Sequence, residues 1–315
     1  MASSDISYLH LNKSLPSDAG SGILNLSATL ASGQNFRWRR DQNGSWWGVV
    51  GDSVLEMGQP EGRPDGPLFW QTYPERDQWD LVRDYFRLNV DLDALYPKWI
   101  AGEPAMEEPL RHFRGLRVLR QPPEECFFGF QCAVCNTVVK IERSVHRLAM
   151  RYGRQLETGL NNSPFDFFAF PTIDALAAAE EAALRADLWG YRGPRVIALA
   201  RHMQQLPAGW LMQLREVDYD QAKTELIAFH GVGAKLADCI ALFSLDKDEA
   251  VPVDTHVRQI ACRLFAPELA DKSLTPRIYG LLADAYRARF GAYAGWAQQY
   301  LFFADLQRAR DFVRC

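Results

Sequence analysis

The chain lacks the segments that would anchor it in a membrane or export it. No apolar run reaches the roughly 18 residues that a membrane-spanning helix requires, so we expect no membrane contact. The first residues, MASSDISYLHLNKS, contain neither a basic start nor an apolar centre, and a secretory signal needs both. We therefore expect an intracellular protein.

Cysteine is scarce and irregularly spaced, with six residues in 315. This usage is typical of a reducing compartment and argues against a disulfide framework. Cys132 and Cys135 form a Cys-x-x-Cys pair, but no second pair follows, and structural zinc sites need four ligands. We expect neither a metal centre nor redox chemistry at this pair.

The chain also lacks a net positive charge, because its formal charge is −4. Residues 1–105 carry 14 acidic and 9 basic residues, a net −5, which leaves about +1 for the remainder. That remainder contains two clusters of basic side chains, Arg111, Arg114, Arg117 and Arg120, and then Lys140, Arg143 and Arg147. A local basic patch can bind nucleic acid while another face is acidic, so the charge does not exclude a DNA-binding protein.

The hydrophobic periodicity divides the chain near residue 105. Before this point the pattern predicts short strands at 22–30, 36–40, 45–50, 52–57 and 68–72, and helices at 78–86 and 92–99. Asp41-Gln42-Asn43-Gly44 is a hairpin-turn signal. Beyond it the pattern is almost entirely helical, at 133–151, 173–185, 192–205, 221–229, 236–245, 275–290 and 294–310. We predict an α+β fold, with an N-terminal antiparallel β-sheet domain at 1–105 and a larger all-α domain at 106–315.

The most informative segment is residues 230–256, HGVGAKLADCIALFSLDKDEAVPVDTH. Gly231 and Gly233 interrupt two helical stretches, and glycines supply the positive φ and the close backbone approach that a tight hairpin needs. The segment therefore predicts helix–hairpin–helix. The hairpin amides and the N-terminus of the second helix would together form a binding site for a phosphate.

Lys235 and Asp254 are the candidate chemical groups of this segment. The helix N-terminus and partial burial both disfavour an ammonium, so we expect Lys235 to be a neutral, nucleophilic amine. The residue before Pro252 cannot be helical, and Asp254 could N-cap a helix that begins at Thr255. The ordinary interpretation is a surface lysine and a capping aspartate. Lys235 and Asp254 at this spacing, behind a glycine hairpin, instead favour a lysine that attacks a DNA sugar.

Several segments in order resemble the eukaryotic-type 8-oxoguanine DNA glycosylase/AP lyase family of the helix–hairpin–helix/Gly-Pro-Asp superfamily. They are 32–38 (SGQNFRW), 113–121 (FRGLRVLRQ) with Glu125-Cys126, 190–192 (GYR), 231–254 and 293–298 (YAGWAQ). The resemblance implies a base-excision repair enzyme that flips 8-oxoguanine, paired opposite cytosine, out of duplex DNA. It cleaves the N-glycosidic bond by lysine attack on C1′ and nicks the strand by β-elimination through a Schiff base.

The resemblance also implies a partner, an oligomeric state, a compartment and a cofactor requirement. The partner is double-stranded DNA containing 8-oxoguanine, and the protein acts as a monomer, in the nucleus of a eukaryote or in the cytoplasm and nucleoid of a bacterium. No cofactor is required, although hairpin carbonyls near Gly231 and Gly233 could hold a structural cation.

The resemblance assigns roles to seven positions. Lys235 would be the nucleophile, and Asp254 would stabilise positive charge on the sugar. The Gly33 carbonyl would accept a hydrogen bond from N7–H of the oxidised base, and Gln298 would hydrogen-bond to its Watson–Crick edge. Phe302 would stack on one face of the base, and Cys239 would form the opposite wall of the pocket. His256 would contact a backbone phosphate. Taken without the resemblance, Gly33 is a turn residue, Phe302 and Cys239 belong to the core, and His256 is an ordinary first-turn residue.

The residues expected at the orphaned cytosine depart in part from the family. Tyr191 matches the family's wedge residue, and Arg192 matches one of the two arginines that contact the cytosine. The run of three asparagines corresponds to Cys135-Asn136-Thr137, so a thiol, natural or engineered, replaces the amide that fills the gap. Lys140 stands where a second arginine is expected, and lysine lacks the planar fork. Both changes predict weaker discrimination of the opposite base.

Two other functions remain open. A superfamily relative could act on another damaged purine, such as an alkylated one, but such enzymes commonly lack the lysine. A non-enzymatic helix–hairpin–helix module could bind DNA through phosphates, and it would need neither Lys235 nor Asp254. No four-cysteine cluster occurs near Cys315, which argues against the iron–sulfur branch of the superfamily.

Overall fold

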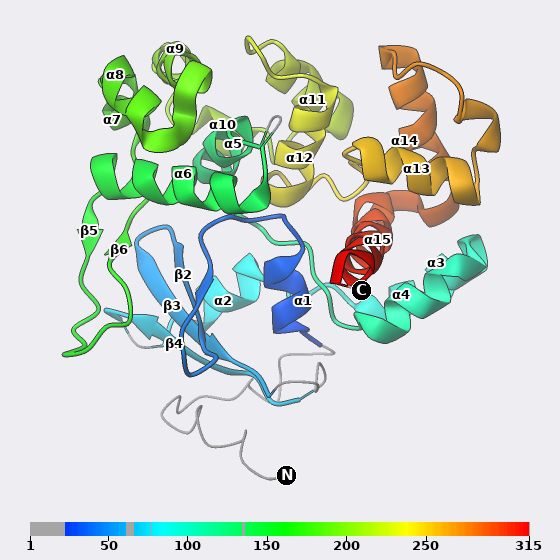
Figure 1. Cartoon of the computed structure of the whole chain (residues 1–315), viewed down its shortest axis with the longest axis horizontal. Helices are drawn as coiled ribbons and strands as arrows, with labels where there is room; N and C mark the ends of the chain where they lie inside the picture. Colours follow the sequence, from blue (N-terminus) through cyan, green and yellow to red (C-terminus); the bar gives the residue numbers. More distant parts are fainter. Residues whose placement is uncertain (1–22, 61–65, 76, 134–135, 315) are drawn as a thin grey trace.

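The N-terminal part is built on an antiparallel sheet. The computed structural model describes residues 23–60, 66–75, 77–133 and 136–314, and Figure 1 shows the sheet beside a larger group of helices. The strands are β1 (Arg39–Arg40), β2 (Trp46–Val50), β3 (Ser53–Gly58) and β4 (Phe69–Tyr73), in that spatial order. The predicted turn joins β1 to β2, and the Asp41 carboxylate accepts from the N–H groups of Asn43 and Ser45, both at 2.9 Å. The α+β class is confirmed.

The first predicted strand is wrong, because this stretch contains helix α1 (Leu26–Ala31). Apolar residues at 24, 26, 28 and 30 alternate like those of a strand. Asn25 decides the local structure, because its side chain accepts from the Ala28 N–H at 3.0 Å and caps the helix. This helix leads directly into the turn that carries Gly33.

The remaining helices begin in the N-terminal part and dominate the rest of the chain. They are α2 (Trp79–Tyr85), α3 (Leu92–Gly102), α4 (Glu107–His112), α5 (Pro123–Gln131), α6 (Val138–Tyr152), α7 (Ile173–Ala177), α8 (Glu181–Leu184), α9 (Gly193–Met203), α10 (Trp210–Gln213), α11 (Tyr219–Ile227), α12 (Ala234–Ser244), α13 (Thr255–Leu264), α14 (Pro276–Phe290) and α15 (Ala294–Arg314). None of the described helices is both long and apolar enough to cross a membrane.

Two predicted helices differ from the structure, and one hairpin was not predicted. The helix expected from 133 begins at Val138, after the extended Thr137. The helix expected over 173–185 divides into α7 and α8, because Glu180 between them is extended. A small antiparallel pair, β5 (Gln155–Leu156) with β6 (Phe167–Phe168), follows α6. Each strand is only two residues long, too short to show an alternating pattern in a region where the helical period dominates.

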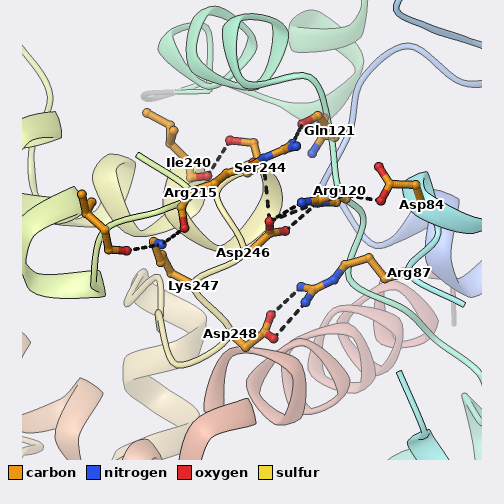
Figure 2. A network of polar contacts seen from close by, with 11 residues as sticks. Asp84, Arg87, Arg120, Gln121, Arg215, Ile240, Ser244, Asp246, Lys247 and Asp248 are labelled. Atoms are coloured by element: carbon orange, nitrogen blue, oxygen red, sulfur yellow. Dashed lines mark hydrogen bonds and ion pairs between the residues drawn. The ribbon is translucent and has the colours of Figure 1, made fainter. Parts of the chain in front are cut away.

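A network of ion pairs holds the loop between α12 and α13 to the N-terminal part of the chain (Figure 2). Arg87 donates to both carboxylate oxygens of Asp248, one at 2.9 Å. Arg120 donates to Asp246 at 2.7 Å, and Asp246 adopts the left-handed φ of 61°. Trp296 on α15 also donates to Asp248, at 2.8 Å. The loop that leads to Asp254 is thus fixed by partners from several elements.

Candidate active site

The helix–hairpin–helix is formed by α11 and α12, as predicted. Gly231 has φ +83°, a backbone conformation that favours glycine over residues with a Cβ. The expectation of positive φ at Gly233 is wrong, because it is the extended N-cap of α12 with φ −90°. A Cβ at Gly233 would meet nothing within 4 Å, which leaves the helix N-terminus open to a phosphate.

A small cavity brings together six of the predicted residues: Gly33, Lys235, Cys239, Asp254, Gln298 and Phe302. They come from the turn after α1, from α12, from the N-cap of α13 and from α15. The cavity holds about 50 Å³ and is completed by Ser32, Phe130, Phe243, Pro252, Val257 and Gln299. A cavity of about 150 Å³ holds a single benzene ring, so the cavity in this state is too small for a purine base.

Lys235 is the second residue of α12 and lies in this cavity with its charge held in place. Its Nζ is 5.9 Å from the centre of the Phe130 ring. The expectation of a lowered pKa is wrong. The pKa of Lys235 is instead raised, by the Cys239 thiolate where that thiol has ionised and by the Asp254 carboxylate, and together these charges outweigh the effect of burial. Burial raises the pKa of the Cys239 thiol to about 11, so at neutral pH the pair is an ammonium beside a thiol.

Asp254 N-caps α13, as predicted. Its Oδ1 accepts from the Val257 N–H at 2.9 Å, and its carboxylate also lines the cavity that contains Lys235. The cap uses one carboxylate oxygen and fixes the side chain at the start of the helix. A rigid carboxylate beside a lysine can stabilise positive charge that develops in this cavity.

Gln298 and Phe302 lie one helical turn apart on α15. Gln298 is buried, at 3% exposed, and its Oε1 has no hydrogen-bond partner among the described residues. A buried acceptor without a partner costs about 1–3 kcal/mol, which favours a ligand that donates to it. Phe302 is partly exposed and packs edge-on against His256, with ring centres 6.2 Å apart. His256 Nδ1 lies 3.1 Å from Asp305.

The Gly33 turn is held by the side chain of Gln34, whose role the sequence did not reveal. Gly33 has φ +79°. The buried Gln34 amide donates to the carbonyls of Thr29 (3.0 Å) and Arg117 (2.8 Å), and its Oε1 accepts from the Leu119 N–H (2.8 Å). Both ends of this side chain are satisfied, so the turn is rigid. Side-chain amides can make such bonds in any fold, so no pattern in the sequence predicted this one.

Of the residues predicted to face the opposite strand, those that the structure describes line no part of this cavity. Tyr191 is 59% exposed, and the Arg192 guanidinium lies over its ring, 4.4 Å from the centre. Lys140 is exposed near the start of α6, and Asn136 is partly buried, with its side chain donating to Cys132. Cys135 lies outside the described residues, so its predicted position is not described.

A buried polar group on α12 was also missed. Asp238 is fully buried and accepts from Lys223 at 2.9 Å and from the Tyr219 hydroxyl at 2.7 Å. A signal was present, because an aspartate within an apolar helical run is almost always paired when it is buried. Among the described residues no group of three or more His, Cys, Asp or Glu is placed to bind a metal.

Two family models match most of the chain. Residues 16–127 match the N-terminal domain of 8-oxoguanine DNA glycosylase, and residues 136–279 match the HhH-GPD superfamily of base excision DNA repair proteins. The N-glycosylase/DNA lyase OGG1 of Arabidopsis thaliana is 36% identical over 298 residues, which cover 92% of this chain and 80% of that protein.

A second relative and a solved structure agree with these matches. The N-glycosylase/DNA lyase of Saccharomyces cerevisiae is 29% identical and covers 89% of this chain and 83% of its own length. The Clostridium acetobutylicum 8-oxoguanine glycosylase/lyase, solved with double-stranded DNA containing cytosine opposite 8-oxoguanine, superposes with a TM-score of 0.78 at 26% identity. That match covers 91% of this chain and 93% of the other.

Proposed function

Because this chain belongs to the 8-oxoguanine DNA glycosylase family of the HhH-GPD superfamily and is a bifunctional N-glycosylase/DNA lyase, we propose that it excises 8-oxoguanine paired with cytosine. One observation carries the proposal. Lys235, Asp254 and Gln298 line the same small cavity, and the Oε1 of Gln298 has no hydrogen-bond partner among the residues that the structure describes. A nucleophile, a stabilising carboxylate and a buried base reader therefore face one space.

Base selection would depend on hydrogen bonds that only the oxidised base can make. 8-Oxoguanine carries a proton on N7, which guanine lacks, and the Gly33 carbonyl would accept it. The Gln298 Oε1 would accept from the Watson–Crick edge and so gain the partner that it lacks. Guanine would leave the carbonyl without a donor, which costs about 1–3 kcal/mol for a buried group.

Base entry requires the cavity to enlarge. At about 50 Å³ it cannot hold a flipped purine, and Phe302 is the partly exposed ring on its wall. Movement of Phe302 away from Cys239 would open a slot in which the base stacks on the ring. Binding energy from the rest of the duplex would drive this rearrangement.

The chemistry follows from Lys235 and Asp254. The Lys235 ammonium must first lose a proton, because its pKa is raised and only the neutral amine attacks. Its Nζ then bonds to C1′ as the bond from C1′ to N9 breaks. The electron pair leaves with the base, which takes up the proton that the amine loses on forming the new bond. Asp254 would stabilise the positive charge on the sugar. Opening of the sugar ring gives a Schiff base, loss of a C2′ proton follows, and the 3′ phosphate is expelled.

The DNA would be held on both sides of the lesion. The hairpin amides around Gly231 and the open N-terminus of α12 at Gly233 would bind the lesion-strand phosphates. His256 would contact a further phosphate. Its present partner Asp305 would hold the ring in place. A structural cation on the hairpin carbonyls remains a proposal that the chemistry does not require.

On the opposite strand, the exposed Tyr191 would act as the wedge and Arg192 would contact the cytosine. Asn136, Cys135 and Lys140 would complete this contact. The resulting preference for cytosine remains part of the proposal.

The test is base release from duplexes that contain 8-oxoguanine, 3-methyladenine or undamaged guanine, with the freed base identified by mass spectrometry. We expect release of 8-oxoguanine and strand nicking at the same site. Gln298→Ala should slow 8-oxoguanine release, while nicking of a preformed abasic site continues. Preferential release of the alkylated purine would favour a relative with another lesion, and binding without release would favour a non-enzymatic module.

A further inference from the structure

We propose that Tyr279 is a positioning residue that fixes Asp254 relative to Lys235. This inference rests on the proposed function, because it concerns the same pair of groups. Tyr279 lies on α14, lines no part of the small cavity and belongs to none of the motifs that identify the family. Its hydroxyl joins the helix that carries Lys235 to the peptide that precedes Asp254.

The hydroxyl of Tyr279 makes two bonds that link separate elements. It donates to the Asp238 carboxylate at 2.6 Å and accepts from the Val253 N–H at 3.1 Å. The Val251 carbonyl is also within 3.3 Å, but the hydroxyl has one proton, and the shorter bond to the carboxylate takes it. The hydroxyl is therefore left as an acceptor toward Val253, the residue directly before Asp254.

Asp238 provides a fixed anchor for this hydroxyl. It lies on α12, three residues after Lys235, so the two side chains share a rigid helix and lie within one turn of each other. Its carboxylate is fully buried and is also bonded by Lys223 and by Tyr219. A buried carboxylate with three donors has little freedom to move.

The path from nucleophile to carboxylate is thus short and buried. It runs from Lys235 along α12 to Asp238, through the Tyr279 hydroxyl to the Val253 amide, and on to Asp254. At its far end the Asp254 side chain is fixed by the cap bond to Val257. Val253 is 1% exposed, so loss of the hydroxyl would leave its N–H buried without that acceptor.

A displacement of Asp254 would slow base release without weakening DNA binding. Misplacement of a reacting group by about 1 Å can cost on the order of 100-fold in rate. Loss of a single hydrogen bond at the preceding peptide should move the carboxylate less than this. We expect Tyr279→Phe to lower the single-turnover rate of 8-oxoguanine release by about tenfold. Its dissociation constant for lesion DNA should stay within a factor of two or so of the wild type.

Tyr219→Phe is the matched control. It removes the other tyrosine hydroxyl that donates to Asp238, but this hydroxyl makes no contact with the 251–254 segment. Both variants lose one hydroxyl at the same buried carboxylate, so their melting temperatures should fall by similar amounts. We expect the excision rate to fall much further in Tyr279→Phe than in Tyr219→Phe, because Tyr279 and Lys223 still hold Asp238 in the control. Equal rate losses in the two variants would overturn the proposal.

A double-mutant cycle shows whether Tyr279 acts through Asp254. In an Asp254→Asn background, which keeps the helix cap, Tyr279→Phe should have no further effect on the excision rate. If Tyr279→Phe folds poorly, Asp238→Asn offers a second test, because it weakens the anchor of the Tyr279 hydroxyl. It should lower the excision rate by less than Tyr279→Phe does, and this loss should also vanish in the Asp254→Asn background. Additive effects would contradict the proposal. Failure of the proposed function would instead appear in the wild-type protein, which would release no base.

Discussion

The side-chain amide of Gln299 donates to the Ser32 carbonyl at 3.0 Å and joins α15 to the turn that carries Gly33. The two residues are 267 positions apart in the sequence, and each is adjacent to a proposed base reader, Gln298 in one case and Gly33 in the other. Both are buried. This bond therefore sets the distance between the two groups that would contact opposite edges of the base.

The first prediction follows from this bond. Gln299→Met keeps the size of the side chain but leaves the Ser32 carbonyl without that donor, so it should lower the free energy of unfolding by about 1–3 kcal/mol. The two base readers should then be less well aligned, which narrows the ratio of dissociation constants for guanine and 8-oxoguanine duplexes. Denaturant unfolding and DNA titrations measure these effects. Gln204→Met, at an exposed glutamine bonded to Asp174, is the control and should change neither.

The sequence predicted the local features of this site well. Gly231 and Gly233 marked the hairpin between α11 and α12, and Pro252 marked the break before α13. These elements and the N-cap role of Asp254 therefore followed from short-range rules. The strands β2 and β3 followed from the period of two and the turn that precedes β2. The resemblance named six residues that the fold brings into one cavity.

The features that were missed depend on contacts between distant segments. The Gln34 and Gln299 bonds and the Tyr279 bridge each join residues that no local pattern relates. The raised pKa of Lys235 depends on Cys239 and Asp254, whose charges outweigh the burial and dipole effects that the sequence suggested. Helix α1 was taken for a strand because its apolar residues alternate.

The second prediction concerns pH. Cys239 has a pKa of about 11 and, once ionised, is the largest cause of the raised pKa of Lys235, so Cys239→Ala should lower that pKa. A neutral amine is needed for attack, so the excision rate should rise with pH, and this rise should move to lower pH in the variant. Single-turnover rates across a pH series measure the shift. A shift to higher pH would show that Cys239 does not raise the pKa of Lys235.

The third prediction concerns the opposite base. Lysine at 140 and cysteine at 135 cannot reproduce the paired donors and acceptors of arginine and asparagine. The double variant Cys135→Asn, Lys140→Arg should therefore prefer cytosine over adenine more strongly than this chain does, by roughly tenfold if one bidentate contact is restored. Excision rates on duplexes that differ only in the opposite base measure the ratio. Equal ratios in the two proteins would place these positions away from the orphaned base.

The fourth prediction concerns acid stability. Burial alone would raise the pKa of Asp246, but its bond to Arg120 and the charges of Arg87, Arg120 and Arg215 lower it overall. A lowered pKa contributes stability that is present above the unfolded value of about 3.9 and is lost as pH falls through the folded value. Asp246→Asn, which tolerates the left-handed φ, should lower the free energy of unfolding by about 1–3 kcal/mol near neutral pH. The difference from the wild type should shrink as the pH falls through the lowered pKa of the folded protein.

The central claim is that Lys235 forms a covalent bond to C1′, and borohydride trapping on an 8-oxoguanine:cytosine duplex tests it most directly. Borohydride reduces a Schiff base to a stable amine, so the wild type should give a cross-linked complex whose adduct maps by peptide mass spectrometry to Lys235. Lys235→Gln should bind the same duplex and give no cross-link, while Lys98→Gln, at an exposed lysine of α3, should trap normally. A cross-link at wild-type level in Lys235→Gln, or an adduct on another lysine, would contradict the account.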